Sequence, residues 1–331
     1  MRLHLGYVPL CDAAPLIAAH ELGFARSEGI DLDLTAEPSW ATLRDRLALG
    51  HLDGAHMLAP LALASRLALS GPPSDLIVPL QLSVNGNAIT LSRDLWAAMD
   101  PDSEAVADAA RAFARVAEAR SREDRPLTLG TVHPFSCHSY QLRLFAEAGG
   151  LDPAAFRTVV VPPQYSVETL ARGLVDGFCA GAPWNDVAVA AGHGRIAVPA
   201  SALAPEAPEK VLAVSERLGD AIPPLVRAVA RAGRCCADPD NRTELIHRLA
   251  RRTYLDLDPA VIGNAFGSAE AAHAGAPLRF DAAIQEPRLE QGQWLLAQMR
   301  ASHQVARPGP LKGAVATVYR PDLYRAAAAD L

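Results

Sequence analysis

The chain has 331 residues, of which 50% are hydrophobic and 21% charged, and its formal net charge is −6. This composition is typical of a folded globular protein with one or two α/β lobes, and it argues against long disordered stretches. A mildly acidic chain is a poor candidate for binding nucleic acid over its whole surface. The sequence has neither an uninterrupted apolar stretch long enough to span a membrane nor an apolar segment of the secretory type at its start, so we expect a cytoplasmic protein with no membrane association.

Cysteine and lysine usage narrows the chemistry further. Five cysteines occur without CxxC or paired Cys/His spacing, so neither a disulfide framework nor a zinc site is expected, and no cofactor is predicted. Lysine is found only at Lys210 and Lys312, whereas every other basic residue is arginine. Such a lysine either has a role of its own, because a compact ammonium differs from a guanidinium, or is a chance exception to an arginine bias.

The first elements along the chain alternate between strand and helix. Residues 3–8 predict a strand, and Asp12 is expected to cap the helix that follows. Residues 31–36 predict a second strand. Ser39 is the expected N-cap of a helix over residues 40–49.

A repeated segment then suggests the architecture. Residues 47–60, LALGHLDGAHMLAP, recur as LARGLVDGFCAGAP at residues 170–183, with seven identical positions in fourteen. Each copy predicts a helix end, a tight Asp-Gly turn, a short buried strand and a proline that opens the next helix. Two copies indicate two similar α/β lobes, unless this common turn pattern arose twice by chance. Because ligands bind where loops leave the carboxyl ends of parallel strands, residues 56–60 and 179–184 are expected to line a cleft.

The middle of the chain predicts the passage between lobes. Residues 76–82 predict a strand, and Asn85-Gly86-Asn87 interrupts an apolar run that resumes at residues 88–90. Such a break suits a hinge or a backbone close to a ligand. Residues 102–120 predict an exposed helix, and residues 127–132 predict the first parallel strand of the second lobe.

The next loop carries the clearest reactive side chains. His133, Cys137 and His138 lead into a helix whose first backbone N–H groups could bind an anion. A catalytic Cys/His pair is conceivable here, but no acidic partner is indicated. Common enzyme motifs such as GxSxG, GxGxxG, the P-loop and HExxH are also missing, so no enzyme is predicted. For His138, donation of a hydrogen bond to a ligand and a purely structural role both remain open.

The rest of the chain completes the second lobe and returns to the first. Residues 158–161 predict a strand and residues 167–174 the helix that enters the second repeat. Residues 210–214 predict a strand that crosses back into the first lobe. Three helices in the tail are expected to pack around that lobe: 223–237, 242–253 and 291–302. The predicted first lobe therefore comprises residues 1–88 and 199–331, and the second comprises residues 89–198.

Four polar side chains together suit a small planar anion. Trp40 and Trp184 each begin a helix at matching places, where an indole could contact a flat ligand or simply fill the core. Lys210 is expected at the boundary between the lobes. With Asn87 and His138, Trp40 and Lys210 supply one cation and several neutral donors, which fits an anion of charge minus one.

A family resemblance joins these features. Eight segments in order resemble the nitrate/bicarbonate-binding proteins, which are the solute-binding proteins of ABC transporters. They are Ala14-Pro15-Leu16, Ser39-Trp40, residues 52–60, residues 85–89, Val160-Val161-Pro162-Pro163, residues 175–179, Pro183-Trp184-Asn185 and Pro208-Glu209-Lys210. The resemblance covers about residues 3–300 and implies an α/β, two-lobe periplasmic-binding-protein type II fold with a cleft between the lobes. It also implies six ligand contacts: Trp40, Gly86, Asn87, His138, Pro163 and Lys210.

The resemblance further implies a function. Within the family, the chain is most similar to cytoplasmic nitrate/nitrite sensors of nitrate assimilation, which release an ANTAR-domain RNA-binding antiterminator when they bind the anion. Direct binding to nucleic acid is not expected. Bicarbonate-binding relatives carry an acidic residue where Lys210 stands and recruit calcium, so Lys210 favours a metal-free nitrate or nitrite site. Asn87 and Ala182 depart from the Gln and Glu that are common in relatives.

Two alternatives remain open at this point. The first is the solute receptor of a nitrate-type ABC transporter, which would require a secretion or lipoprotein signal. The second is an enzyme related to the pyrimidine-synthesising members of the same fold superfamily, which would use histidine and cysteine with iron. Of the residues that such an enzyme needs, the sequence offers only Cys137 near two histidines.

Overall fold

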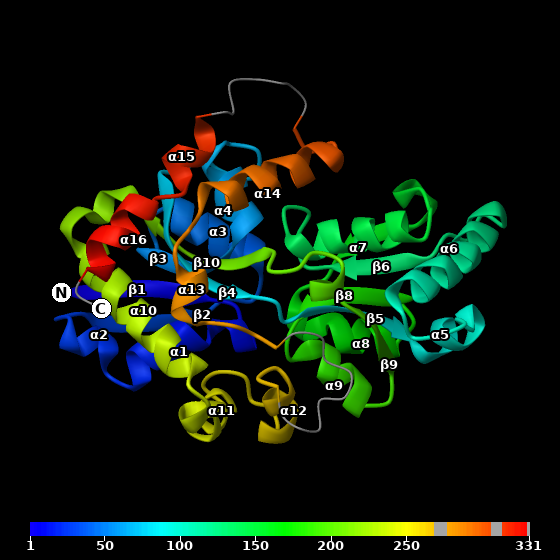
Figure 1. Ribbon diagram of the computed structural model, residues 1–331, viewed down its shortest axis with the longest axis horizontal. Coiled ribbons are helices and arrows are strands. Elements are labelled where there is room, and N and C mark those ends of the chain that lie inside the picture. The colour runs from blue at the N-terminus through cyan, green and yellow to red at the C-terminus, as the bar shows by residue number, and fades with distance from the viewer. Residues whose placement is uncertain (268–276, 306–312, 330–331) are drawn as a thin grey trace.

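Two α/β lobes lie side by side in the computed structural model, which describes residues 1–267, 277–305 and 313–329 (Figure 1). Each lobe is built on one five-stranded sheet with helices packed on it. The first sheet has the order β2 (Asp31–Ala36), β1 (Arg2–Tyr7), β3 (Gly54–Leu58), β10 (Pro208–Ser215) and β4 (Leu76–Val84). The second has the order β7 (Arg157–Val160), β6 (Thr128–Thr131), β8 (Gly177–Gly181), β5 (Asn87–Ser92) and β9 (Gly194–Pro199).

The two sheets follow one plan, which confirms the repeat. The strands of the two repeat copies, β3 and β8, occupy the middle of their sheets. Each pairs in parallel with the strand before it, β1 or β6, and antiparallel with a strand that arrives from the other lobe, β10 or β5. The expectation of parallel sheets is therefore wrong in part. The sheets are mixed because each lobe accepts one crossing strand in the reverse direction.

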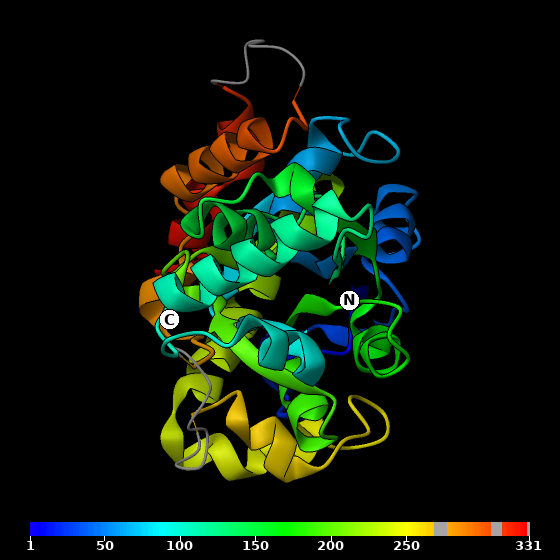
Figure 2. The same ribbon diagram turned by 90° about the vertical axis from the view of Figure 1, so that its right-hand side faces the viewer.

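Helices cover both sheets. Those of the first 190 residues are α1 (Ala14–Glu21), α2 (Phe24–Ser27), α3 (Trp40–Ala48), α4 (Ala59–Arg66), α5 (Arg93–Met99), α6 (Val106–Arg122), α7 (Cys137–Ala148), α8 (Ser166–Ala171) and α9 (Trp184–Ala190). Those of the tail are α10 (Ile222–Ala237), α11 (Arg242–Leu249), α12 (Pro259–Asn264), α13 (Ala282–Gln285), α14 (Leu289–Ala301), α15 (Ala314–Val318) and α16 (Pro321–Ala328). When the second lobe faces the viewer, α14 lies towards the top and α11 and α12 towards the bottom (Figure 2).

The predicted interruption between strands is a tight crossing between lobes. β4 ends at Val84, and Asn85 and Gly86 take left-handed conformations with φ of 67° and 82° before β5 begins. A side chain at Gly86 would collide with Leu278, so both the backbone angle and the space favour glycine. The chain returns between β9 and β10. The lobe boundaries proposed from the sequence stay a prediction, and residues 268–276, 306–312 and 330–331 of the proposed first lobe lie outside the described residues.

Ser39 caps α3 as predicted, and its Oγ accepts a hydrogen bond from the Thr42 backbone N–H at 3.1 Å. Asp12 does not cap a helix: it lies in the short helix η1 (Cys11–Ala13), and α1 begins at Ala14 without a side-chain cap. Its carboxylate has partners elsewhere, described below. The expectation that α6 is exposed is also wrong, because several of its alanines and Phe113 form a buried face. The ring centroid of Phe113 lies 5.1 Å from that of Phe145.

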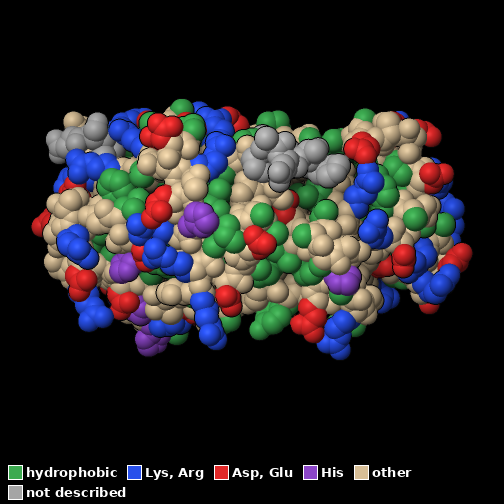
Figure 3. All heavy atoms as spheres, turned by 90° about the horizontal axis from the view of Figure 1, so that it is seen from below, with side chains coloured by type: hydrophobic (Ala, Val, Ile, Leu, Met, Phe, Trp, Pro, Cys, Tyr) green, Lys and Arg blue, Asp and Glu red, His purple; other side chains and the backbone are tan. Residues whose placement is uncertain are grey.

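The distribution of surface charge and the character of the helices are consistent with the near-balanced charge and the absence of a long apolar stretch in the sequence. Basic and acidic side chains are interspersed on the face shown in Figure 3. Within the described part of the chain, no helix has both the length and the apolar character that a membrane span requires.

Candidate functional site

Four predicted or neighbouring polar side chains meet in a closed region between the sheets. Trp40, His56, His138 and Lys210 come from α3, β3, α7 and β10, and each is 0% exposed. A buried polar group normally has a hydrogen-bond partner, because its desolvation is otherwise uncompensated. Groups without one therefore indicate where a ligand is bound.

Trp40 is held by the start of α3. Its ring centroid lies 5.3 Å from that of His56 and 5.8 Å from Lys210 Nζ, within range of a cation–π interaction. The indole Nε1 has no hydrogen-bond partner among the described residues. Trp40 therefore packs as a core residue and still presents one unused donor.

His138 is the second residue of α7, after Ser136, whose Oγ accepts from the Ser139 N–H at 3.1 Å. Neither ring nitrogen of His138 has a hydrogen-bond partner in the described chain. Burial, reinforced by the charge of Lys210, holds the pKa of His138 well below its usual range. The imidazole is therefore neutral and offers one N–H donor.

Lys210 shares its buried position with Asp12. Lys210 Nζ lies 2.9 Å from Asp12 Oδ2, and His56 Nε2 lies 2.8 Å from Asp12 Oδ1. The atoms are close enough for ion pairing, although neither Lys210 Nζ nor Asp12 Oδ1 is aligned with a described partner as a hydrogen bond. Burial opposes the charged form of each group. Even so, the Asp12 carboxylate raises the pKa of Lys210, and the Lys210 ammonium keeps the pKa of Asp12 well below its usual range.

A second carboxylate, Glu209, lies beside this pair. Its two oxygens accept from Asn87 Nδ2 at 2.5 Å and Gln141 Nε2 at 2.6 Å, and Lys210 Nζ is 4.0 Å away. Asn87 Nδ2 also contacts Gln141 Oε1 at 3.1 Å, whereas Asn87 Oδ1 has no hydrogen-bond partner among the described residues. Asn87 thus lies at the site, but its amide N–H groups point at protein acceptors.

The two remaining predicted contacts lie on loops next to this cluster. The Gly86 carbonyl accepts from the Ala182 N–H at 2.8 Å, which fixes the crossing strand against the second repeat. Pro163 is buried at the start of η3 (Pro163–Tyr165), and the next residue, Gln164, donates to the Pro38 carbonyl at 2.8 Å. The second contact joins the Pro163 loop to the segment that precedes Trp40.

Hydrogen bonds between the lobes keep the region closed. The Cys11 N–H donates to the Ala182 carbonyl at 3.0 Å, and Trp184 Nε1 donates to the Pro9 carbonyl at 3.3 Å. On the side of the tail, Gln304 Oε1 accepts from the Tyr140 hydroxyl at 2.9 Å. Because the central side chains have no exposed surface, a ligand can reach them only when these contacts open. Trp184 contributes to closure through its indole N–H.

The Cys/His arrangement considered from the sequence is not poised for nucleophilic chemistry. Cys137 Sγ donates to the Pro208 carbonyl at 3.3 Å, and burial holds the pKa of its thiol well above the usual range. His133 Nδ1 accepts from the Phe135 N–H at 3.0 Å, and burial together with the nearby charge of Arg44 lowers the pKa of His133 to about 4. A reactive cysteine needs a lowered thiol pKa, which is the opposite of this environment. Among the described residues, no three His, Cys, Asp or Glu side chains are grouped to hold a metal ion.

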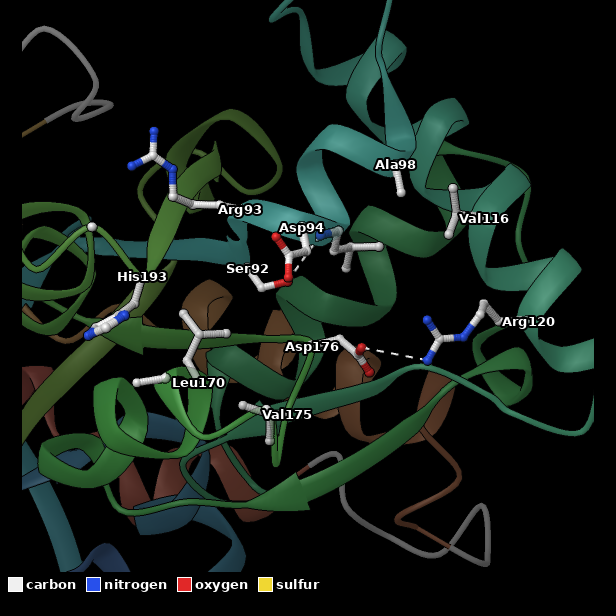
Figure 4. A pocket seen from close by; sticks show the side chains of 14 residues that line it. Ser92, Arg93, Asp94, Ala98, Val116, Arg120, Leu170, Val175, Asp176 and His193 are labelled. Atoms are coloured by element: carbon white, nitrogen blue, oxygen red, sulfur yellow. Dashed lines mark hydrogen bonds and ion pairs between the residues drawn. The ribbon is translucent and has the colours of Figure 1, made fainter.

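A separate hollow lies in the second lobe, at the junction of α5, α6 and α8 (Figure 4). Its volume is about 660 Å³, and Arg120 and Asp176 face each other across part of it, with 3.8 Å between Nη2 and Oδ1. None of the six predicted contact residues lines this hollow. It is therefore distinct from the closed cluster around Lys210.

Four residues of the cluster were not predicted from the sequence: Asp12, His56, Gln141 and Glu209. His56 was expected to line the cleft as the first of residues 56–60 but was not named as a ligand contact. Glu209 fell inside the Pro208-Glu209-Lys210 segment, in which only Lys210 was named as a contact. Gln141 lies one helical turn after His138, a spacing that places both side chains on one face of α7. That spacing was the available signal.

Comparisons with known proteins identify the family and the fold of the chain. A model of the NMT1-like family matches residues 1–250. The chain is 32% identical to the nitrate import ATP-binding protein NrtC of Synechocystis, over 98% of this chain and 49% of that protein. It is 31% identical to the nitrate/nitrite binding protein NrtA of Synechocystis, over 76% of this chain and 57% of that protein. The chain thus spans about half the length of the curated relatives that it matches.

Solved structures give the same result for the fold. The crystal structure of the periplasmic nitrate-binding protein NrtA from Synechocystis PCC 6803 aligns with a TM-score of 0.90 and 27% identity, covering 100% of this chain and 89% of that one. The alkanesulfonate-binding protein SsuA from Xanthomonas axonopodis pv. citri aligns with a TM-score of 0.69 and 16% identity, covering 95% and 97%. At 16% identity the latter speaks for the fold alone. The predicted two-lobe periplasmic-binding-protein fold is confirmed.

Proposed function

This chain belongs to the NMT1-like family, and on that premise we propose that it is a receptor that closes on nitrate or nitrite between its two lobes. The observation that carries the proposal is a buried set of donors: Trp40 Nε1 and one ring N–H of His138, which have no hydrogen-bond partner among the described residues, and Lys210 Nζ, whose described partner is the Asp12 carboxylate at 2.9 Å. An anion placed among these donors would accept their hydrogen bonds. The hydrogen bond from the Lys210 ammonium would be the strongest, because its donor is charged. The sequence relationship to NrtA, named a nitrate/nitrite binding protein, supports the choice of anion.

The remaining predicted contacts fit this proposal as supports. Gly86 allows the crossing strand to turn beside the anion, and the Pro163 loop closes over it from the second lobe. Lys210 in place of an acidic residue favours a monovalent anion without calcium. Binding by Asn87 requires its amide to turn away from Glu209 or to act through a water molecule.

We further propose that the receptor is a cytoplasmic sensor, because its closure gives a ligand-dependent shape that a partner can recognise. An anion that contacts both lobes stabilises the closed form by its differential affinity for that form. A partner that binds the open form, here an ANTAR-domain antiterminator, would then be released. The resemblance of its motifs to cytoplasmic nitrate/nitrite sensors motivates this partner.

A second candidate function is the anion receptor of an ABC transporter. The observation that favours it is the identity of the relatives, which include an ATP-binding transport protein matched over 98% of this chain. Enzymatic activity is a weaker candidate. Desulfurization enzyme DSZB shares the fold at 16% identity, and the buried thiol of Cys137 lacks the environment of a nucleophile.

Isothermal titration calorimetry of the protein in a chelator-containing, chloride-free buffer tests the binding proposal. Nitrate or nitrite is expected to bind one per chain without added metal, and bicarbonate to bind weakly or not at all. Lys210→Glu should abolish the binding heat, because it replaces the only buried cation of the cluster with a carboxylate. Equal binding of bicarbonate, or full nitrate binding by Lys210→Glu, would contradict the proposal.

The sensor and transporter functions differ in what nitrate does to a partner. A mixture with a purified ANTAR-domain antiterminator should elute as a complex in gel filtration without nitrate and as separate proteins with it. Lys210→Glu should stay in complex under both conditions. Absence of a complex without nitrate, together with nitrate-dependent stimulation of a transporter's ATPase, would replace the sensor with the transport receptor. Recovery of the native protein outside the cytoplasmic fraction would contradict the localisation.

A further inference from the structure

The charges buried around Lys210 do not balance. Six titratable side chains face Glu209 or the Asp12–Lys210 pair from five elements: Asp12 of η1, His56 of β3, Cys137 and His138 of α7, Cys179 of β8 and Lys210 of β10. None of these side chains is more than 2% exposed, and Glu209 itself is 2% exposed. The region therefore holds two carboxylates and one ammonium, while the histidines and thiols are neutral.

The two carboxylates are not equivalent. Asp12 has the ammonium at 2.9 Å and the His56 ring at 2.8 Å, so it is held in its charged form. Glu209 accepts from the uncharged amides of Asn87 and Gln141, its neighbouring thiol Cys137 is also uncharged, and its distance from the ammonium is 4.0 Å. Since the charges of Asp12 and Lys210 cancel, an ionised Glu209 leaves the region with a net charge of minus one.

An entering anion would add a second negative charge to this closed region. Like charges that share a site with little water disfavour each other strongly, and the usual outcome is that one of them takes up a proton. We propose that the anion enters together with one proton and that Glu209 holds this proton in the closed, loaded form. This inference rests on the proposed anion binding and specifies in addition which side chain is protonated when the anion is bound.

Asn87 provides the hydrogen-bonding partner that a protonated Glu209 requires. Asn87 Oδ1 has no hydrogen-bond partner in the described chain. It lies near Asp12 Oδ2, because a Cβ atom placed on Gly181 would be 3.3 Å from Asn87 Oδ1 and 3.6 Å from Asp12 Oδ2. A half-turn of the Asn87 amide exchanges its two ends. The carbonyl oxygen then accepts from the Glu209 hydroxyl, and the NH₂ group turns towards the region of Asp12, Lys210 and the anion. This turn gives up the contact of Asn87 Nδ2 with Gln141 Oε1, which keeps the Cys179 thiol as a donor at 3.6 Å. Protonation of Glu209 thereby frees the donor that Asn87 was predicted to supply.

The titration of Glu209 agrees with this geometry. Burial raises the pKa of Glu209 to about 7, against the opposing effects of Lys210, Gln141 and Asn87. Cys137 and Cys179 have pKa values raised by burial, so both are already protonated and cannot take up the proton. His138 and His56 are the other groups that could take up the proton. Burial lowers the pKa of each, which disfavours their protonation relative to that of Glu209.

Calorimetric titration with nitrate in buffers of different ionisation enthalpy tests the inference, because the slope of heat against buffer enthalpy counts protons. The wild type at pH 8 is expected to take up about one proton per nitrate, and its affinity should fall about tenfold per pH unit above that pH. At pH 6 the uptake should be small, because Glu209 is already protonated. Glu209→Gln, which copies the protonated carboxyl in shape, should bind nitrate with no uptake and no dependence on pH. Glu216→Gln, the same change at an exposed carboxylate, should behave as the wild type.

The outcomes separate this inference from the proposed function. Nitrate binding by the wild type at pH 8 without proton uptake would overturn the inference and leave the receptor function intact. Uptake that persists in Glu209→Gln would also overturn it, because the proton would then reside on another group. Absence of nitrate binding at every pH would overturn both. Should Glu209→Gln fail to fold, the proton count of the wild type at pH 8 and pH 6 still decides the matter.

Discussion

Lys210 Nζ lies 2.9 Å from Asp12 Oδ2, and neither side chain is more than 2% exposed. The ammonium is therefore partly neutralised by the protein itself, and an anion at this site is held by the surrounding donors as well as by charge. The pair gives Lys210 two roles, one in stability and one in binding. The two roles can be separated by experiment.

Lys210→Met alone should leave Asp12 charged and unpaired in the interior, with a loss of about 3–5 kcal/mol in the free energy of unfolding. Adding Asp12→Asn removes the stranded charge and should restore most of that loss, whereas nitrate binding stays absent in both variants. Urea denaturation and calorimetry measure the two effects. Arg122→Met on the exposed face of α6 is the control and should change neither. Equal stability of the single and double variants would show that the two side chains are not coupled.

Trp40→Phe removes the unpartnered indole N–H and keeps an aromatic ring against His56 and Lys210. Loss of one hydrogen bond to a charged ligand is expected to weaken nitrate binding about tenfold. Stability should change by less than about 1.5 kcal/mol, because the replacement is aromatic and no protein hydrogen bond is lost. Trp294→Phe on α14 is the matched control. If both variants bind nitrate like the wild type, the Trp40 donor is not part of the site.

Gln304→Ala removes two contacts between the lobes, since its side chain accepts from the Tyr140 hydroxyl at 2.9 Å and donates to the Pro134 carbonyl at 2.8 Å. The closed form should lose about 1–2 kcal/mol, so nitrate should dissociate about 5- to 30-fold faster. Stopped-flow displacement measures the rate. Thr317→Ala, which affects a hydrogen bond within α15 only, should leave it unchanged. A wild-type dissociation rate in Gln304→Ala would show that the hydrogen bonds of Gln304 do not limit opening of the lobes.

His133 makes the stability of the protein depend on pH. Its pKa is lowered from 6.5 to about 4, first by burial and then by Arg44, so the unfolded chain binds the proton more readily than the folded one. The stabilising contribution of the neutral ring is complete above pH 6.5 and is lost as the pH falls towards 4, by about 2–3 kcal/mol. The difference in unfolding free energy between the wild type and His133→Asn should shrink over that window. A difference that stays constant from pH 7 to pH 4 would contradict this assignment.

The parts of the fold that sequence predicted well depend on local chemistry. The Asp53-Gly54 and Asp176-Gly177 turns are short-range signals, and each precedes the strand expected from it, β3 and β8. The break at Asn85-Gly86-Asn87 is likewise local, because left-handed angles at two successive residues favour Asn and Gly. Such signals need no knowledge of the rest of the chain.

The parts that it missed depend on residues far apart in the sequence. Asp12 looked like a helix cap because short-range preference favours that role, but Lys210 and His56 recruit its carboxylate into the centre. Glu209 lies next to Lys210 in sequence, yet its role follows from Asn87 and Gln141 on other elements. The six predicted contact residues stay a prediction for nitrate itself, although Trp40, Asn87, His138 and Lys210 do lie in one buried cluster.

Small-angle X-ray scattering with and without nitrate tests the central claim that the lobes close on the anion. The account predicts a smaller radius of gyration at saturating nitrate for the wild type, and no change for Lys210→Glu at the same concentration. An unchanged radius of gyration in a wild-type sample that calorimetry shows to be saturated would contradict it, because binding would then not be coupled to closure.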